Sequence, residues 1–183
     1  GFFNNDKVRS KRSGDFLTSP EVSKYFGKIL NQWIQESDLD LNIVEFGSGT
    51  GSLIEQINTE NKFAVELSST ARVELSKKNI QNVASLEELT FNESDLVFGN
   101  EVLDNIPCSV AVFKDNKWYE KVVNLEEEIF SYDFVKARKE IIDWIEINQI
   151  TGDENIDIEV QLNIDKFLEN IIHNLNPKRI LFF

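Results

Sequence analysis

The chain is short of the residues that build metal centres and disulfide frameworks. It holds one Cys and one His in 183 residues, and it has no Met. A single Cys excludes an internal disulfide framework, and one Cys with one His offers no metal-ligand spacing, so we expect no metal site. No stretch is long and apolar enough to span a membrane, and the first residues carry no signal-peptide pattern.

Basic residues are scarce relative to acidic ones. The chain has 32 acidic and 19 basic residues, which gives a formal net charge of -13. Because this charge repels polyphosphate chains over the whole surface, we expect no nucleic-acid partner. A basic protein segment is the kind of partner that the charge favours.

The length and the two ends of the chain set its expected organisation. At 183 residues and 41% hydrophobic content, the chain is long enough for a single domain with a sizeable core. It begins at Gly1 without a Met and ends on the apolar run Ile180 to Phe183. We interpret residues 1–183 as a partial domain, truncated at both ends. A longer form is expected to be more soluble and more stable, because it would cover the apolar edge left by the last strand.

Strand and helix patterns alternate along the first half of the chain. Such alternation predicts an α/β fold with a parallel sheet and flanking crossover helices. The last apolar strand is expected to lie beside the strand at 95–99. The expected elements are strands at 41–46, 62–66, near Val83, at 95–99 and at 179–183, with helices from Ser52 and at 69–79.

The remaining segments carry other patterns. Residues 109–123 predict an inserted β-hairpin that turns at Asp115 and Asn116. Helices are expected from Asp133 to about Asn148, and over the apolar stripe between Ile164 and Leu175.

The N-terminal region, residues 1–40, is expected to be a polar loop followed by a helix. Thr18 to Glu21 combine a capping hydroxyl, a proline and an acid, which is a typical helix start. The residues expected to pack this helix on the sheet are Val22, Phe26, Ile29, Leu30 and Trp33.

The most informative segment is IVEFGSGTGSL, residues 43–53. Its apolar strand breaks into three alternating glycines, Gly47, Gly49 and Gly51. Glycine tolerates positive φ and has no Cβ, so the chain can turn sharply and its backbone can press against a ligand. Such a pattern alone is often only a tight turn. Glu66, at the end of the next strand, lies where doubly wound folds bind a ribose diol, and it favours a cofactor loop.

The residue before the glycines indicates which cofactor the loop would hold. Glu45 precedes Gly47 by two positions, and a carboxylate there repels phosphate but suits a cation. S-adenosylmethionine carries a sulfonium, an ammonium and a ribose. The E-x-G-x-G-x-G pattern resembles motif I of class I methyltransferases, so we expect a Rossmann-like fold that binds S-adenosylmethionine and not a dinucleotide.

A second candidate site follows the strand at 95–99. The sequence DLVFGNEVLDNIP places Asn100, Glu101 and Asp104 at the carboxyl end of this strand, where open parallel sheets bind ligands. Two carboxylates would suit a cationic acceptor, since guanidinium presents donors that match them. Alternatively, Asn100 and Asp104 cap a helix that begins near Val102.

Three separated segments together resemble the MidA family of S-adenosylmethionine-dependent methyltransferases. The strings G-D-F-x-T-S-P-E and N-E-x-L-D-x-x-P carry most of this resemblance. The matching segments are GDFLTSPEVSKYFG (14–27), IVEFGSGTGSL with FAVELSSTAR (63–72), and NEVLDNIP (100–107) with Trp118, Tyr119 and Glu120.

The resemblance assigns roles to individual residues. It implies that the loop with Glu45 holds the methionine end of the cofactor, that Glu66 holds the ribose, and that Asp15 belongs to an N-terminal lid. Arg72 could support Glu66, but we expect it on the helix surface. The implied cofactor-binding residues are Asp15, Thr18, Ser19, Glu45, Gly47, Ser48, Gly49, Gly51, Glu66, Leu67 and Asn100, and the implied catalytic residues are Asn100, Glu101 and Asp104.

The resemblance also implies an activity. Mitochondrial members of the family are complex I assembly factors that methylate an arginine of a core subunit, so we expect a protein arginine methyltransferase. Its compartment would be the bacterial cytoplasm or the mitochondrial matrix. Two alternatives stay open: a non-catalytic assembly module with the same fold, and a small-molecule methyltransferase. The oligomeric state is left open as well.

Overall fold

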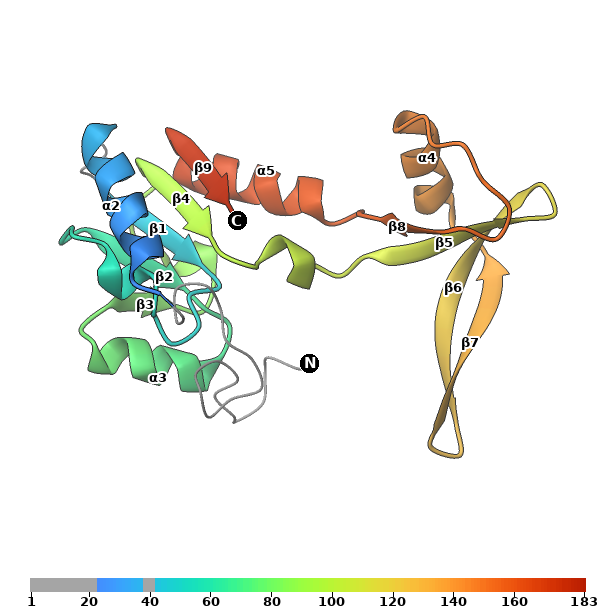
Figure 1. The fold of residues 1–183 in the computed structure, drawn as a ribbon, viewed down its shortest axis with the longest axis horizontal. Coiled ribbons are helices and arrows are strands. Elements are labelled where there is room, and N and C mark those ends of the chain that lie inside the picture. Colours follow the sequence, from blue (N-terminus) through green and yellow to red (C-terminus); the bar gives the residue numbers. More distant parts are fainter. Residues whose placement is uncertain (1–22, 38–41) are drawn as a thin grey trace. The chain divides into compact units, whose positions relative to one another are not determined.

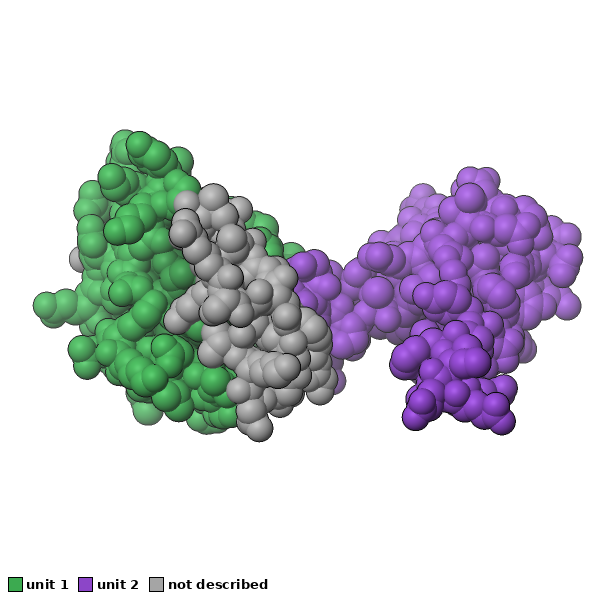
Figure 2. All heavy atoms as spheres, turned by 60° about the horizontal axis from the view of Figure 1, so that its bottom comes forward, with its two compact units in different colours: residues 1–103, 170–183 green, residues 104–169 purple. Residues whose placement is uncertain are grey.

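The structure is a computed structural model that describes residues 23–37 and 42–183. The contacts divide the chain into two compact units (Figure 1, Figure 2). Unit 1 comprises residues 1–103 and 170–183, and unit 2 comprises residues 104–169. The sequence predicted one domain with a small inserted hairpin. The inserted segment is instead a compact unit with its own sheet.

Unit 1 is built on a five-stranded sheet in the order β3-β2-β1-β4-β9. All four neighbouring pairs are parallel. The predicted parallel sheet is therefore confirmed, and so is the place of the last strand beside β4. The strands are β1 (Ile43–Phe46), β2 (Lys62–Val65), β3 (Gln81–Val83), β4 (Leu96–Gly99) and β9 (Arg179–Phe182).

Strands β1 and β4 are covered on both faces. Successive residues of a strand point to opposite sides of the sheet. Ile43 and Val44 on β1 are both fully buried, as are Leu96 and Val97 on β4. Continuous apolar runs of this kind are typical of a parallel sheet between helices.

The helices of unit 1 follow the predicted positions with one exception. The helix predicted from Ser52 is only a single 3-10 turn at Ile54–Gln56. The α3 helix starts where Ser68 caps it, accepting a hydrogen bond from the Ala71 amide at 3.3 Å. The helices are α2 (Tyr25–Glu36), α3 (Ser69–Lys77) and α5 (Ile164–Leu175), whose first residues belong to unit 2.

The apolar stripe of α2 is narrower than predicted. Leu30 and Ile34 are buried in the core, and Phe26 and Trp33 pack against it. Ile29 is 68% exposed, so its predicted packing on the sheet is wrong. The predicted helix start at Thr18 to Glu21, and Val22, lie outside the described residues.

Unit 2 contains a four-stranded antiparallel sheet in the order β7-β6-β5-β8, together with helix α4. The predicted hairpin is present, and both Asp115 and Asn116 at its turn have positive φ. Its second strand continues beyond residue 123. The elements are β5 (Ser109–Lys114), β6 (Lys117–Glu126), β7 (Ile129–Lys136), α4 (Lys139–Ile147) and β8 (Asp157–Val160).

The prediction of a helix from Asp133 is wrong in its first turns, because residues 129–136 form β7. Phe134 and Ala137 lie at helical spacing ahead of Ile141 and Ile145, which made the pattern look continuous. Only the last two are buried positions of α4. The alternating apolar residues of 129–136 follow the period of a strand, and pairing with β6 decides between the two patterns.

The two neighbouring apolar residues of α2 test the observed packing. Leu30→Ala should lower the free energy of unfolding by about 2–5 kcal/mol, because it opens a cavity under the helix. Ile29→Ala should change it by less than about 0.5 kcal/mol, since the side chain is mostly exposed. Urea unfolding followed by circular dichroism measures both. Equal losses for the two variants would contradict the assigned face.

Candidate functional site

The register of the sheet brings three predicted site residues to one edge. Phe46 is the register partner of both Val65 on β2 and Gly99 on β4. The residues that directly follow these three positions are Gly47, Glu66 and Asn100. They therefore leave the sheet side by side at its carboxyl edge, where open parallel sheets bind their ligands.

The loop after β1 depends on its three glycines. Gly47, Gly49 and Gly51 have φ values of +62°, +52° and +80°. L-amino acids rarely adopt this left-handed region, so each position favours glycine. A Cβ on Gly51 would also lie 2.6 Å from the Leu75 side chain. The alternating pattern thus reflects a backbone requirement at every second residue.

The two residues between the glycines are buried. Ser48 is 7% exposed and Thr50 is 2% exposed. The Ser48 hydroxyl donates to the Glu45 carbonyl at 3.1 Å, which ties the loop back to β1. The Thr50 hydroxyl is buried without a hydrogen-bond partner among the described residues. Gly47 and Gly49 keep exposed surface, so backbone is what the loop offers to a ligand.

Glu66 connects two loops at this edge. Its Oε2 accepts a hydrogen bond from the Gly49 amide, and its Oε1 accepts one from the Ser68 amide, both at 2.8 Å. Burial raises the pKa of Glu66, while these two hydrogen bonds and the charge of Arg72 lower it. Leu67 beside it is a large apolar residue with 71% of its surface exposed.

Arg72 supports the backbone at Glu66, the alternative to the helix-surface position that we expected from the sequence. Its guanidinium donates to the carbonyls of Glu66 and Leu67, each at 2.8 Å. It therefore fixes the backbone that carries the Glu66 carboxylate, and the expectation of a simple helix-surface residue is wrong. The signal in the sequence was its position six residues after Glu66, about one turn into the helix that follows.

Glu45 is the most unusual ionisable group of the site. It is 3% exposed, and its Oε2 has no hydrogen-bond partner among the described residues. Loss of hydration raises the pKa of Glu45 to about 8, the Glu66 charge adds to this rise, and hydrogen bonds from Ser48 and Ile54 oppose it. A buried carboxylate with an open acceptor is well placed to receive a cationic group.

Asn100 and Glu101 follow β4 directly. Asn100 is partly buried and Glu101 is exposed. Glu101 has a φ of +53°, which is uncommon for a residue other than glycine. Its amide donates to the Phe183 carbonyl at 3.0 Å, so the last residue of the chain holds this backbone. Backbone strain of this kind clusters at ligand-binding sites.

Val102 is a packing residue that the sequence analysis missed. A Cβ added to Gly47 or to Gly99 would lie 2.9 Å from the same Val102 methyl group. This side chain therefore occupies the space left by both glycines and keeps the loop after β4 against the loop after β1. In the sequence, only Gly99, directly before Asn100, indicated that a side chain packs closely against the backbone here.

The remaining predicted residues are not brought to this edge by described contacts. Asp104 is the first residue of unit 2 and lies inside a 3-10 turn, Leu103–Asn105, rather than before it as a capping residue would. Its carboxylate accepts a hydrogen bond from the Asn105 amide group at 3.4 Å. Asp15, Thr18 and Ser19 lie outside the described residues.

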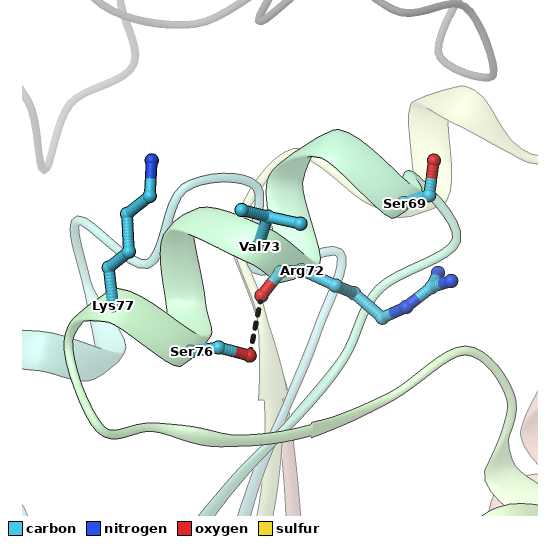
Figure 3. Close-up of a pocket in the computed structure, with 5 residues that line it drawn as sticks. All are labelled: Ser69, Arg72, Val73, Ser76 and Lys77. Atoms are coloured by element: carbon cyan, nitrogen blue, oxygen red, sulfur yellow. Dashed lines mark hydrogen bonds between the residues drawn. The ribbon is translucent and has the colours of Figure 1, made fainter.

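A surface hollow of about 600 Å³ lies elsewhere in unit 1 (Figure 3). Five residues of α3 line it, and none of them is a predicted site residue. They are Ser69, Arg72, Val73, Ser76 and Lys77. The Arg72 guanidinium already binds the two carbonyls described above, so this hollow contributes to the site only through that support.

Two classes of feature are missing from residues 23–37 and 42–183. None of the helices there has the length and apolar character needed to cross a membrane. In the same residues, no three His, Cys, Asp or Glu side chains gather closely enough to hold a metal ion.

Comparison with known families gives one match over most of the chain. Residues 25–183 match the model of a family described as "Putative S-adenosyl-L-methionine-dependent methyltransferase". The match includes the glycine loop, Glu66 and the segment after β4. It begins within the first helix that the structure describes.

Two solved structures from Burkholderia thailandensis share the fold. One is a protein bound to S-adenosyl-homocysteine, with a TM-score of 0.74 and 22% identity over 92% of this chain. The other, a native crystal structure, has a TM-score of 0.69 and 22% identity over 90% of this chain. This chain covers 49% of each of those two chains, and thus about half of their length.

The raised pKa of Glu45 predicts how stability depends on pH. The carboxyl group ionises near pH 4.5 in the unfolded chain but near pH 8 in the folded protein. The folded state therefore binds more protons between these values, and stability falls as the pH rises through this window. Glu45→Gln removes this loss of folding stability, which amounts to about 1.4 kcal/mol for each unit of pKa difference.

Thermal melting without cofactor at several pH values tests this expectation. Glu45→Gln and the parent should melt at similar temperatures near pH 4.5, and the variant should gain over the parent up to about pH 8. Glu60→Gln, which changes an exposed carboxylate of the same unit, is the matched control and should show no such gain. A constant difference between Glu45→Gln and parent across the range would contradict the assigned burial penalty.

Proposed function

The chain belongs to this family of S-adenosyl-L-methionine-dependent methyltransferases, and we propose that it binds the cofactor at the carboxyl edge of the unit 1 sheet and methylates an arginine of a protein substrate. The observation that carries the cofactor site is the buried Oε2 of Glu45 beside the glycine loop, which has no hydrogen-bond partner in residues 23–37 and 42–183. The acceptor is proposed from the sequence after β4 and from the resemblance to the MidA family.

The methionine end of the cofactor would lie at the glycine loop. Its ammonium would donate a hydrogen bond to Oε2 of Glu45, which has no partner among the described residues. The positive charge of the ammonium would also favour the ionised form of this carboxylate. Gly47 and Gly49 expose backbone on which the cofactor can lie closely, with Ser48 and Gly51 holding the loop in shape. A dinucleotide would instead bring a pyrophosphate toward Glu45, which that carboxylate would repel.

The ribose would lie at Glu66. The two oxygens of Glu66 each accept one backbone hydrogen bond, and a carboxylate has further lone pairs for the ribose hydroxyls. The exposed side chain of Leu67 would add apolar surface next to the sugar. Asn100, at the end of β4, would be within the same edge of the sheet. From the resemblance, Asp15, Thr18 and Ser19 would form a lid over the cofactor.

The proposed reaction moves a methyl group from sulfur to nitrogen. A guanidinium nitrogen attacks the methyl carbon, the carbon–sulfur bond breaks, and its electron pair stays on sulfur, giving S-adenosyl-homocysteine. The nitrogen then loses one proton to solvent. Because the sulfonium already has its leaving group, the protein mainly has to hold the nitrogen in line with the methyl group.

Carboxylates can supply this orientation. A guanidinium stays charged at any working pH and presents its donors in a planar fork, which paired carboxylates can grip. Glu101 and Asp104 are the proposed pair, and Asn100 is a further hydrogen-bond partner. The strained backbone of Glu101 supports this role, since its conformation is maintained at a cost.

The substrate is proposed to be a respiratory complex I subunit, by the resemblance to the MidA family. The net charge of -13 fits a basic protein segment as partner. The compartment would be the cytoplasm of a bacterium or the mitochondrial matrix of a eukaryote.

Glu66→Ala should weaken S-adenosyl-L-methionine binding at least about tenfold, which corresponds to 1.4 kcal/mol. The reason is the loss of charge-assisted hydrogen bonds to the ribose hydroxyls. Since Glu66 also binds the Gly49 amide, part of the loss could come from the loop. Isothermal titration with both S-adenosyl-homocysteine and its 2′,3′-dideoxy analogue separates the two causes.

The parent should lose affinity for the dideoxy analogue, whereas Glu66→Ala should bind the two ligands nearly equally. Such non-additive losses identify a direct contact between the changed groups. If the variant discriminates between the ligands as strongly as the parent, the ribose lies elsewhere.

Asp104→Asn should keep cofactor affinity and lose methyl transfer to a protein arginine. The change removes the charge that helps to turn the guanidinium, so the loss belongs to the chemical step and not to cofactor binding. Titration and transfer of a radiolabelled methyl group should be measured on one preparation, with respiratory complex I subunits as candidate substrates. The protein should be used at its natural length.

Asp153→Asn, an exposed carboxylate of unit 2 outside the loop after β4, is the matched control and should leave transfer unchanged. Full activity of Asp104→Asn would show that residues 100–107 are structural. Methylation of small molecules alone would overturn the protein substrate, and tight cofactor binding with no transfer to any acceptor would favour an assembly module.

A further inference from the structure

The β6–β7 hairpin of unit 2 carries a concentration of exposed apolar side chains. Seven large hydrophobic residues on these two strands are exposed. They are Val123, Leu125, Ile129, Phe130, Tyr132, Phe134 and Val135. Exposed apolar patches of this density mark interaction sites in folded proteins.

Much of this hairpin is a ribbon of only two strands. The pairing of β5 with β6 extends only from Val110↔Lys121 to Lys114↔Lys117, so residues from Val122 onward pair with β7 alone (Figure 1). A two-stranded ribbon is marginal in water without further cover. β7 is also an edge strand of the sheet. No other strand of the described residues pairs with its outer side, which therefore offers backbone groups to another strand.

The turn of the hairpin fixes which residues offer their backbone. Glu127 and Glu128 have φ values of +47° and +67°, which are typical of a two-residue type I′ turn. The flanking pair Glu126↔Ile129 is then a hydrogen-bonded pair, and such pairs alternate along the ladder. The N–H and C=O groups of the next residue, Phe130, and of every second residue after it point away from β6.

The outward residues are Phe130, Tyr132 and Phe134, and their side chains share one face of the sheet. The Phe134 amide confirms the direction, because it donates to the carboxylate of Asp133 at 2.7 Å and not to β6. Lys121 contacts the Tyr132 ring at 4.6 Å, and Lys114 contacts the Phe134 ring at 3.5 Å. This edge is thus an aromatic row with backbone groups ready to pair.

We propose that β7 pairs antiparallel with β7 of a second copy of this chain, around a two-fold axis at Tyr132. Tyr132 then lies opposite Tyr132 of the second copy, and Phe130 lies opposite its Phe134. These opposed residues are those whose backbone groups point outward, so they form hydrogen-bonded pairs. The two sheets join into one continuous sheet, and the interface is self-complementary as two-fold symmetry requires.

The side chains select this register among those that a two-fold axis allows. It brings aromatic residues opposite one another on one face, which stabilises cross-strand pairing. On the other face it brings Ser131 opposite Asp133, where the hydroxyl can replace the Phe134 amide as donor. It also brings Glu128 opposite Lys136, a pair of opposite charge. Moving the axis by one residue, to Asp133, would bring two aspartates together.

The charges near the hairpin tip argue against anionic occupants. Glu126, Glu127 and Glu128 follow one another at the turn. Three carboxylates there repel anionic lipid headgroups and nucleic-acid phosphates. Lys121, on the aromatic face, is already paired with Asp157 at 2.6 Å. A second copy would bind through backbone hydrogen bonds and aromatic contacts along β7, and these do not require a net charge on this face.

Sedimentation velocity over a range of concentrations tests the proposal on the protein at its natural length. The parent should form a dimer, and Tyr132→Lys should raise the dissociation constant at least about tenfold, because two lysines would meet at the axis. Ser131→Lys is the matched control, with the same charge change on the same strand. It should keep or strengthen the dimer, since the lysine would face Asp133 of the second copy.

Cysteine cross-linking tests the register itself. In a Cys108→Ser background, which leaves residues 1–183 without a natural cysteine, Tyr132→Cys should form an intermolecular disulfide under mild oxidation. Phe130→Cys should not, because the two cysteines would be about 13 Å apart along the strands, beyond disulfide reach. A monomer at every concentration, a dimer unaffected by Tyr132→Lys, or equal cross-linking at both positions would overturn the proposal.

Discussion

A carboxylate deprived of water is the constraint on which the proposed site depends. Glu45 lies on the central strand β1, between β2 and β4, and only 3% of the residue is exposed to solvent. Keeping an ionised carboxylate there is costly unless a cation or hydrogen-bond donors compensate, so its pKa rises. The rest of the site can be understood as an arrangement around this group. Next to it in the chain is a loop whose surface positions are the glycines Gly47 and Gly49, and a second acid, Glu66, holds this loop through the Gly49 amide.

The same arrangement shows why the glycines alternate. Ser48 and Thr50 are both buried, and Ser48 ties the loop to β1, while Gly47, Gly49 and Gly51 take left-handed conformations on either side of them. Buried side chains therefore alternate along the loop with glycines, of which Gly47 and Gly49 keep exposed backbone. Glu66 and Arg72 complete the support from the next strand and its following helix. Such support from a rigid scaffold keeps a binding site in shape before the ligand arrives.

The sequence predicted the parallel sheet of unit 1, but of unit 2 it predicted only the hairpin of β5 and β6 and the helix that contains α4. The fold of unit 1 follows from short apolar strands with turn residues and helical stripes between them, and the alternating glycines from Gly47 to Gly51 indicate a sharply turning loop. β7 was mistaken for helix because Phe134 and Ala137 happen to lie at helical spacing before Ile141. Only the pairing with β6 resolves that ambiguity, and a long-range pairing leaves little trace in local spacing. Val102 and Arg72 were missed or misjudged for a similar reason, since their roles depend on contacts across loops.

Proton release on cofactor binding tests the central claim most directly. Isothermal titration of S-adenosyl-L-methionine at pH 7, in buffers of different ionisation enthalpy, gives the number of protons released. If the ammonium meets Glu45, binding should lower the pKa of that group, and the parent should release close to one proton more than Glu45→Gln does. Equal proton release and equal affinity in the two proteins would contradict the account.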